Sequence, residues 1–178
     1  MNVTKWRWLH GVPVIPEWSV VVMNIRYRLA RAEDAPAIGV LARRVTRRWI
    51  LPEQPASAAV PILAGMGARV IRQKIQAGQR FHLAWLDGEH LVGVAAMRDD
   101  SHLFQFFVST RLQGHGIARQ LWQRVMRDAV RRAGTRHFTL NSSAVAEPVY
   151  ERLGFVPSGP VTITANGVTT RPMRFDLP

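Results

Sequence analysis

Cysteine is absent from this chain of 178 residues. Its absence excludes disulfides, thiolate nucleophiles and the zinc frameworks that depend on cysteine ligands. The six histidines show no paired spacing typical of metal ligands, so the sequence predicts no metal site. Apolar runs are short as well, and none approaches the roughly 20 residues that a membrane-spanning helix needs. We therefore expect a cytoplasmic protein with no membrane partner.

Acidic residues are scarce: 12 Asp and Glu stand against 24 Lys and Arg, which gives a formal net charge of +12. A positive field of this kind favours anionic partners, such as nucleic acid, acidic lipid head groups or a phosphorylated cofactor. The sequence contains no helix-turn-helix, zinc finger or aromatic RNA-binding signature. A solvated basic surface explains the charge equally well, so nucleic acid is not the expected partner.

The first 22 residues differ from the rest of the chain. Their apolar run, residues 18–23, is too short to span a bilayer, and regular alternation begins only near Asn24. Met23 offers an alternative start. We interpret residues 1–22 as an N-terminal extension and residues 23–178 as a single domain.

Hydrophobic periodicity predicts a mixed α/β (α+β) domain. Apolar alternation and short apolar runs predict strands over residues 24–30, 80–86, 90–97, 102–108 and 137–142, and a closing hairpin over residues 161–175. Helical spacing predicts helices over residues 31–50, 56–77, 116–133 and 146–153, the second of them broken or delayed at Pro61. The pair Asp87-Gly88 predicts a tight hairpin between two of the strands.

The stretch "QGHGIARQLW", residues 113–122, joins a predicted strand to a predicted helix through two glycines. The first N–H groups of such a helix lack intrahelical partners, and the macrodipole adds positive charge, so the two together form an anion site. A Walker loop requires a lysine that is missing here, and a dinucleotide fingerprint requires a third glycine where Arg119 stands. The pattern Gln/Arg-x-x-Gly-x-Gly/Ala fits, with Gln113, Gly116 and Ala118.

Three stretches together resemble the GNAT superfamily of N-acetyltransferases: "YRLARAEDAPAIGVL", "FFVSTRLQGHGIARQLW" and "LNSSAVAEPVYERLGF". The resemblance covers roughly residues 24–177. It implies a central, mostly antiparallel mixed sheet of about 6–7 strands, splayed at its two central strands and flanked by about four helices. The chain departs from the common pattern at Thr110, where a proline is frequent, and at Ser143, where an asparagine is frequent.

The same resemblance implies that acetyl-CoA is the cosubstrate. Its pyrophosphate would lie on the amides of residues 113–118, with Arg111 and Arg119 as phosphate neighbours, since guanidinium groups fork onto phosphate oxygens. Its pantetheine arm would separate residues 106–108 from the strand that contains Leu140 and Asn141. The implied cofactor-binding residues are Phe106, Phe107, Val108, Arg111, Gln113, Gly114, His115, Gly116, Ile117, Ala118, Arg119, Asn141 and Ser143.

The resemblance also implies that a primary amine attacks the thioester directly in a ternary complex. Tyr150 matches the superfamily's frequent general acid, and we favour this role, although a tyrosine on a short helix can also pack in the core. A backbone N–H near Phe107 would stabilise the oxyanion. For the base, the sequence offers Glu53, Asp99, Asp100, His102, Gln105 or a water held by Asn141 or Ser142, and it does not choose among them.

Two other functions remain compatible with the sequence. A non-catalytic module that binds acyl-CoA would keep the glycine loop, and a nucleic-acid-binding module would use the basic surface. The acceptor amine has no readable signature in the sequence. The resemblance also allows a homodimer, because dimers are common in the superfamily.

Overall fold

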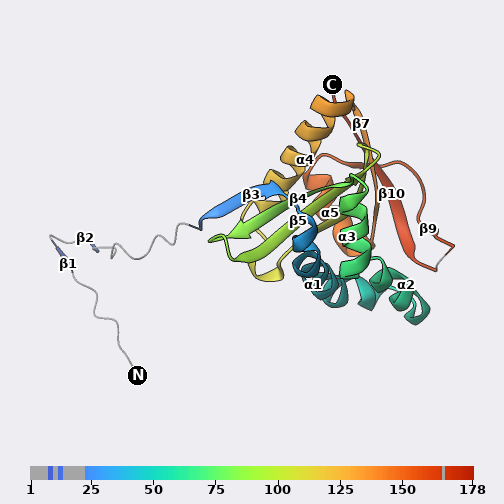
Figure 1. The fold of residues 1–178 in the computed structure, drawn as a ribbon, viewed down its shortest axis with the longest axis horizontal. Coiled ribbons are helices and arrows are strands. Elements are labelled where there is room, and N and C mark those ends of the chain that lie inside the picture. The colour runs from blue at the N-terminus through green and yellow to red at the C-terminus, as the bar shows by residue number, and fades with distance from the viewer. Residues whose placement is uncertain (1–7, 10–11, 14–22, 166) are drawn as a thin grey trace.

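The fold was analysed in a computed structural model that describes residues 8–9, 12–13, 23–165 and 167–178. Two short strands, β1 (Trp8–Leu9) and β2 (Val12–Pro13), pair in antiparallel fashion. Most of the predicted extension, residues 1–22, lies outside the described residues. Residues 23–178 form an open sheet with helices on both faces (Figure 1).

The main sheet has eight strands in the order β3-β4-β5-β6-β7-β10-β8, with β9 paired to the start of β10. Their bounds are Ile25–Leu29 (β3), Arg80–Leu86 (β4), His90–Arg98 (β5), His102–Val108 (β6), His137–Ser142 (β7), Val156–Pro157 (β8), Thr162–Ile163 (β9) and Thr169–Asp176 (β10). Neighbouring strands are antiparallel except for β6 and β7, which are parallel. This is the mostly antiparallel mixed sheet that we expected, enlarged by the two-residue strand β8.

Five α-helices cover the sheet: α1 (Ala35–Val45), α2 (Ala59–Ala64), α3 (Ala68–Gln76), α4 (Ile117–Ala133) and α5 (Glu147–Arg152). Helices α4 and α5 pack against one face, where Leu121, Trp122 and Tyr150 join a core cluster with Phe138 and Leu140. Helices α1 and α3 pack against the other face through a second cluster. The sheet is therefore the middle layer of three (Figure 1).

The second predicted helix is divided in two, and our placement of the break was wrong. Pro61 lies in the first turn of α2, where a missing N–H leaves no helical bond unmade. The helix is interrupted instead between Gly65 and Gly67. At this break the Met66 carbonyl oxygen accepts a hydrogen bond from Arg43 Nη1 at 2.6 Å, so a tertiary contact satisfies the freed group.

The first predicted helix also changes its character before it ends. Regular α-helix stops at Val45, and residues Thr46–Ile50 continue as a π-helical turn, followed by a 3₁₀ turn over Leu51–Glu53. The indole Nε1 of Trp49 donates to Thr110 Oγ1 at 3.1 Å. The end of this helical segment is thereby fixed to the loop that follows β6.

Close packing of α4 on the sheet depends on Gly93 in β5. A Cβ atom at this position would lie 2.7 Å from Leu121 Cδ1 and 3.2 Å from Ile117 Cγ2. The bare backbone lets the first two turns of α4 lie directly on β5. The N-terminus of α4 is thereby held beside the carboxyl end of β6.

Candidate active site

Strands β6 and β7 separate from one another along their length. Within the described residues, the one ladder pair between them is His102 with Thr139, at the amino end of β6. Beyond this pair the two parallel strands share no further ladder contact. The sheet therefore opens as a wedge, with its vertex at His102 and its mouth at Val108, in agreement with the splay that we expected.

Backbone groups of β6 face into this wedge. The N–H of Ser109 donates to the Val92 carbonyl on β5 at 2.8 Å. The hydrogen-bonding direction of successive residues alternates along an antiparallel pair. The N–H of Phe107 therefore also points to β5, and the N–H groups of Phe106 and Val108 point to β7. Of the N–H groups near Phe107, where we expected an oxyanion donor, those of its two neighbours are therefore the ones directed into the wedge.

The loop after β6 contains both glycines in the left-handed region, with φ of 83° at Gly114 and 77° at Gly116. Other residues adopt this conformation at a cost, because their Cβ crowds the carbonyl oxygen. Apart from the adjacent residues in the chain, no atom of the described residues lies within 4 Å of where a Cβ would be at either glycine. The backbone conformation thus demands glycine, and the space beside it is free for a ligand.

Gly116 is the N-cap residue of α4 and provides no side-chain cap. The first backbone N–H that bonds within the helix is that of Gln120, which donates to the Gly116 carbonyl at 3.1 Å. The N–H groups of Ile117, Ala118 and Arg119 are therefore at the uncapped positive end of a 17-residue helix. This arrangement is an anion cradle.

Side chains of the loop hold the cradle in shape. Gln113 Nε2 donates to the Val108 carbonyl at 3.4 Å, and His115 Nδ1 lies 3.0 Å from the Gln113 carbonyl. The Ile117 side chain is buried in the core, so only its backbone N–H is available to a ligand. Arg111 and Arg119 are both exposed beside the loop.

Tyr150 comes to the wedge from α5. Its ring lies 5.9 Å from that of Phe106 on β6 and 5.9 Å from that of Phe155, measured between centroids. Burial alone raises the pKa of the Tyr150 hydroxyl well above its usual 10.0. The hydroxyl therefore stays protonated around neutral pH and is available as a hydrogen-bond donor.

Ser143 follows β7 on the other side of the wedge. Its carbonyl accepts hydrogen bonds from the N–H groups of Ala146 (3.0 Å) and Glu147 (3.2 Å), which begins α5 and so positions Tyr150. Its Oγ is buried and has no hydrogen-bond partner within the described part of the chain. An unpaired buried hydroxyl beside the wedge fits a ligand that supplies the missing partner.

The candidate bases are not brought together in one place. Glu53 Oε2 accepts the Val145 N–H at 3.0 Å, Asp100 pairs with Arg132 at 3.2 Å and Asp99 with Arg98 at 3.5 Å. Gln105 Nε2 donates to the Gly65 carbonyl at 3.4 Å. His102 alone lies at the vertex of the wedge.

His102 is paired with a residue that the sequence analysis did not single out. Its Nδ1 lies 2.9 Å from Thr139 Oγ1 on β7. Burial, aided by the charge of Arg98 and opposed by Asp99, lowers the pKa of His102 below its usual 6.5, so the imidazole is neutral at pH 7. Thr139 alternates with the buried Phe138 and Leu140 and therefore faces the side of the sheet opposite α4 and α5.

Asp128, in the middle of α4, was also overlooked in the sequence. Its carboxylate is buried and accepts hydrogen bonds from Arg80 Nε (2.5 Å) and Nη2 (3.0 Å), with His82 Nε2 at 3.2 Å. Burial pushes the pKa of Asp128 upward, but the charges and hydrogen bonds of Arg80 and His82 outweigh it, so the pKa is lowered. This network fixes α4 to β4. Asp128 lies three positions after Val125 on the same helix. This i, i+3 spacing is the only signal in the sequence that Asp128 faces inward.

No described helix is both long enough and apolar enough to cross a membrane. In the same part of the chain, no three histidine, aspartate or glutamate side chains converge as they would around a metal ion.

Comparison with known proteins was made at the level of sequence and of fold. A family model described as an acetyltransferase (GNAT) domain matches residues 53–177. No curated protein matches this sequence.

Several solved structures share the fold. A GCN5-related N-acetyltransferase from Rhodopseudomonas palustris superposes with a TM-score of 0.74 at 18% identity, over 89% of this chain and 99% of that one. The PaiA N-acetyltransferase from Thermoplasma acidophilum, solved with coenzyme A, gives 0.68 at 16% identity over 86% and 99%. A protein from Salmonella typhimurium, solved with its cofactor acetyl-CoA, gives 0.59 at 18% identity over 87% and 95%. At these identities the likeness shows the fold alone.

Proposed function

Since this chain belongs to the acetyltransferase (GNAT) family, whose model matches residues 53–177, we propose that it is an N-acetyltransferase that moves the acetyl group of acetyl-CoA to a primary amine. One observation carries the proposal: the wedge between β6 and β7 opens directly onto the uncapped N-terminus of α4. A ligand with a long arm and a pyrophosphate group matches both parts of this site. The neighbours solved with coenzyme A and acetyl-CoA support the same donor.

The cradle would hold the pyrophosphate through the N–H groups of Ile117, Ala118 and Arg119. From Val108 to His102, β6 extends over about 20 Å at the usual rise per residue. The backbone N–H of Val108 and the carbonyl of Phe106 would bind the amides of an extended arm in the wedge. When bound, the cosubstrate supplies an activated acetyl group, with the thioester beside Phe106 and Tyr150.

Three groups divide the chemistry. The Phe106 N–H, directed into the wedge, stabilises the negative charge that develops on the carbonyl oxygen. The Tyr150 hydroxyl, adjacent to Phe106, donates its proton to the departing thiolate as the C–S bond breaks. His102 accepts the proton that the amine loses as the C–N bond forms. Because His102 lies about 13 Å from Phe106 along the strand, a chain of several ordered waters would relay this proton from the amine to the imidazole.

The acceptor amine approaches from the face opposite α4 and α5. On that face Thr139 and Asn141 of β7 are exposed, because α1 and α3 cover β4, β5 and β6 instead. The donor occupies the side of the cradle and of Tyr150. The two substrates thus reach the wedge from opposite faces, as a direct attack requires.

The proposal is tested by measuring thiol release from acetyl-CoA with a panel of primary amines that includes polyamines, amino acids and peptide N-termini. Mass spectrometry of the product would show whether nitrogen carries the acetyl group. In Tyr150→Phe we expect kcat to fall about 100-fold, the usual contribution of one general acid. The ring packing against Phe106 and Phe155 is retained, so affinity for CoA and the melting temperature should not change. A non-catalytic acyl-CoA-binding module would release no thiol with any amine.

A further inference from the structure

A second cavity lies away from the wedge, on the same face of the sheet as α4. It is a groove of about 660 Å³ between the C-terminal half of α4 and the strands β3 and β4. Arg124 and Arg131, on α4, lie about 10–20 Å beyond the cradle at the helical rise of 1.5 Å per residue. The order β3-β4-β5-β6 places two strands between β3 and the wedge strand β6. The groove is therefore separate from the candidate active site.

The groove is strongly basic. Five arginines line it: Arg28, Arg80, Arg124, Arg127 and Arg131. Asp34 neutralises Arg28, whose Nη1 and Nη2 donate to the two carboxylate oxygens at 2.7 and 2.8 Å. The carboxylate of Asp128 is likewise paired with Arg80. Arg131 comes only within 3.9 Å of Asp128. Among the described residues, no carboxylate pairs with Arg124 or Arg127, so uncompensated positive charge faces the groove.

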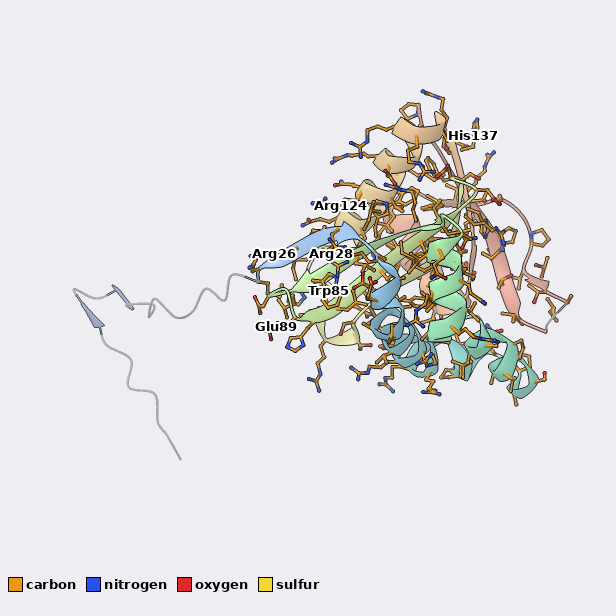
Figure 2. All side chains as sticks on the ribbon, viewed as in Figure 1. Arg26, Arg28, Trp85, Glu89, Arg124 and His137 are labelled. Atoms are coloured by element: carbon orange, nitrogen blue, oxygen red, sulfur yellow. The ribbon has the colours of Figure 1, made fainter. Side chains whose placement is uncertain are left out.

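Arg124 is held in place rather than free in solvent. Its guanidinium carbon lies 4.4 Å from the centroid of the Tyr27 ring, in a cation–π contact between α4 and β3. Figure 2 shows Arg124 on α4 and Arg28 on β3 at this edge of the molecule. A guanidinium that is already oriented loses little conformational freedom when it binds an anion.

Tyr27 supplies an independent indication of a ligand. Its hydroxyl oxygen is buried but has no hydrogen-bond partner within the described residues. Burial raises the pKa of this hydroxyl, with Arg124 opposing, so the group stays protonated and remains a donor without an acceptor. Unpaired buried polar groups are uncommon and cost stability. An anionic oxygen that displaces the side chain covering this hydroxyl would accept its hydrogen bond and pair with Arg124 at the same time.

The remaining lining is apolar. Leu29, Met126 and Val130 form part of it, together with the Tyr27 ring. Leu29 is 38% exposed, so its side chain is accessible from the groove. The volume lies in the range of small-molecule sites, which combine an apolar lining with a few oriented polar groups. Both features fit a ligand with an apolar body and one anionic end.

We propose that this groove is a second ligand site, which binds a small phosphate monoester with an apolar or aromatic body through Arg124, Arg127 and the Tyr27 hydroxyl. The Tyr27 ring and the aliphatic side chains contact the body. The proposal is independent of acetyl transfer, because none of these residues belongs to the wedge or the cradle.

The test is an NMR titration of the ¹⁵N-labelled full chain with phenyl phosphate, in the presence of CoA so that the cradle is filled. Saturating shifts are expected for the amides of β3 and of residues 124–131. If CoA does not bind, the titration is repeated with Gly116→Glu, in which the glutamate side chain blocks the cradle. Shifts that remain then report binding in the groove. Shifts confined to residues 113–119, or spread over all basic segments, would overturn the proposal.

Variants make the test specific. Arg124→Gln should weaken phenyl phosphate binding about tenfold, the usual effect of one charge-assisted contact. Tyr27→Phe should weaken it several-fold, although it removes no hydrogen bond of the free protein. Arg44→Gln is the matched control, because Arg44 is an exposed arginine on α1, on the opposite face, and lines a different arginine cluster. Equal losses in Arg44→Gln and Arg124→Gln would show a general ionic effect and contradict the site.

Inorganic phosphate serves as the second probe. It is expected to shift the same amides as phenyl phosphate but to bind several-fold more weakly, because it cannot contact the apolar lining. Equal affinity for the two probes would contradict the proposed contact between the apolar body of the ligand and the side chains of Tyr27 and the aliphatic residues.

Discussion

The two ends of α4 allow the role of the cradle to be separated from the stability of the helix. Gly116 precedes the helix with φ of 77°, and Gly134 follows it with φ of 64°. In the part of the chain that the structure describes, no atom beyond the adjacent residues lies within 4 Å of an added Cβ at either position. Alanine at either glycine should therefore cost about 1–2 kcal/mol of unfolding free energy, the penalty of the left-handed conformation. In a chain of this size the melting temperature should fall by about 2–8 °C in both variants.

Cofactor affinity should distinguish the two variants. Gly116→Ala moves the first N–H groups of α4 out of line with a bound phosphate, and losing one charge-assisted hydrogen bond costs about 2 kcal/mol. The Kd for acetyl-CoA should then rise about 30-fold. Gly134→Ala lies about 25 Å away along the helix and should leave this Kd unchanged. Calorimetric titration gives the affinities and thermal unfolding gives the stabilities. Equal Kd values in the two variants, with equal losses of stability, would refute the placement of the cradle.

The remaining predictions concern His102, Tyr150 and Asp128. Since the His102 pKa lies below 6.5, kcat/KM of the wild type should rise as the pH increases through that lowered pKa. His102→Gln should remove this acidic limb and reduce kcat/KM about 100-fold, and an unchanged pH profile would exclude His102 as the base. Because the Tyr150 hydroxyl stays protonated, it should give the pH profile of kcat/KM no basic limb below pH 10. A basic limb below pH 10 that disappears in Tyr150→Phe would contradict the raised pKa of Tyr150. Asp128→Asn should lower the unfolding free energy by about 2–4 kcal/mol at pH 7 in urea titrations.

The pH dependence of the Asp128 effect follows from the direction of its shift. The folded-state pKa is below the usual 3.8, so the contribution is complete above that value and is lost as the pH falls through the folded-state pKa. Burial lowers the pKa of His82 and Asp128 raises it, so the difference between wild type and Asp128→Asn should not decrease from neutral pH down to about pH 5, and it should shrink in stronger acid. A difference that already vanishes near neutral pH would show that Asp128 is not held ionised by Arg80 and His82.

Local sequence signals were sufficient for most of the sheet and for the cradle. The pair Asp87-Gly88 predicted the β4–β5 hairpin, and both residues have positive φ there. The two glycines before α4 were recognisable because their conformation is a property of the chain itself. Strand β8 was missed because two residues, Val156–Pro157, are too short to show any periodicity.

Features that depend on distant contacts were not predictable. The break between α2 and α3 lies where Gly39 of α1 meets the Met66 carbonyl, 2.7 Å from the position of an added Cβ. Nothing near Gly65 in the sequence indicates that contact. In the same way, the sequence favoured His102 among the ionisable candidate bases only by its position at the start of a strand, and the pairing with Thr139 then placed it at the vertex. The direction of the Phe106 and Val108 N–H groups likewise follows only from the register with β5.

The most direct test of the central claim is a calorimetric titration of acetyl-CoA into the full chain at low and high salt, beside Gly116→Glu. The account predicts saturable binding at one site that the variant loses and that salt weakens only slightly, because a shaped backbone cradle holds the ligand. Binding to a diffuse basic surface would instead fall steeply with salt. Absence of saturable binding at both salt concentrations would contradict the assignment of the wedge and the cradle to acetyl-CoA.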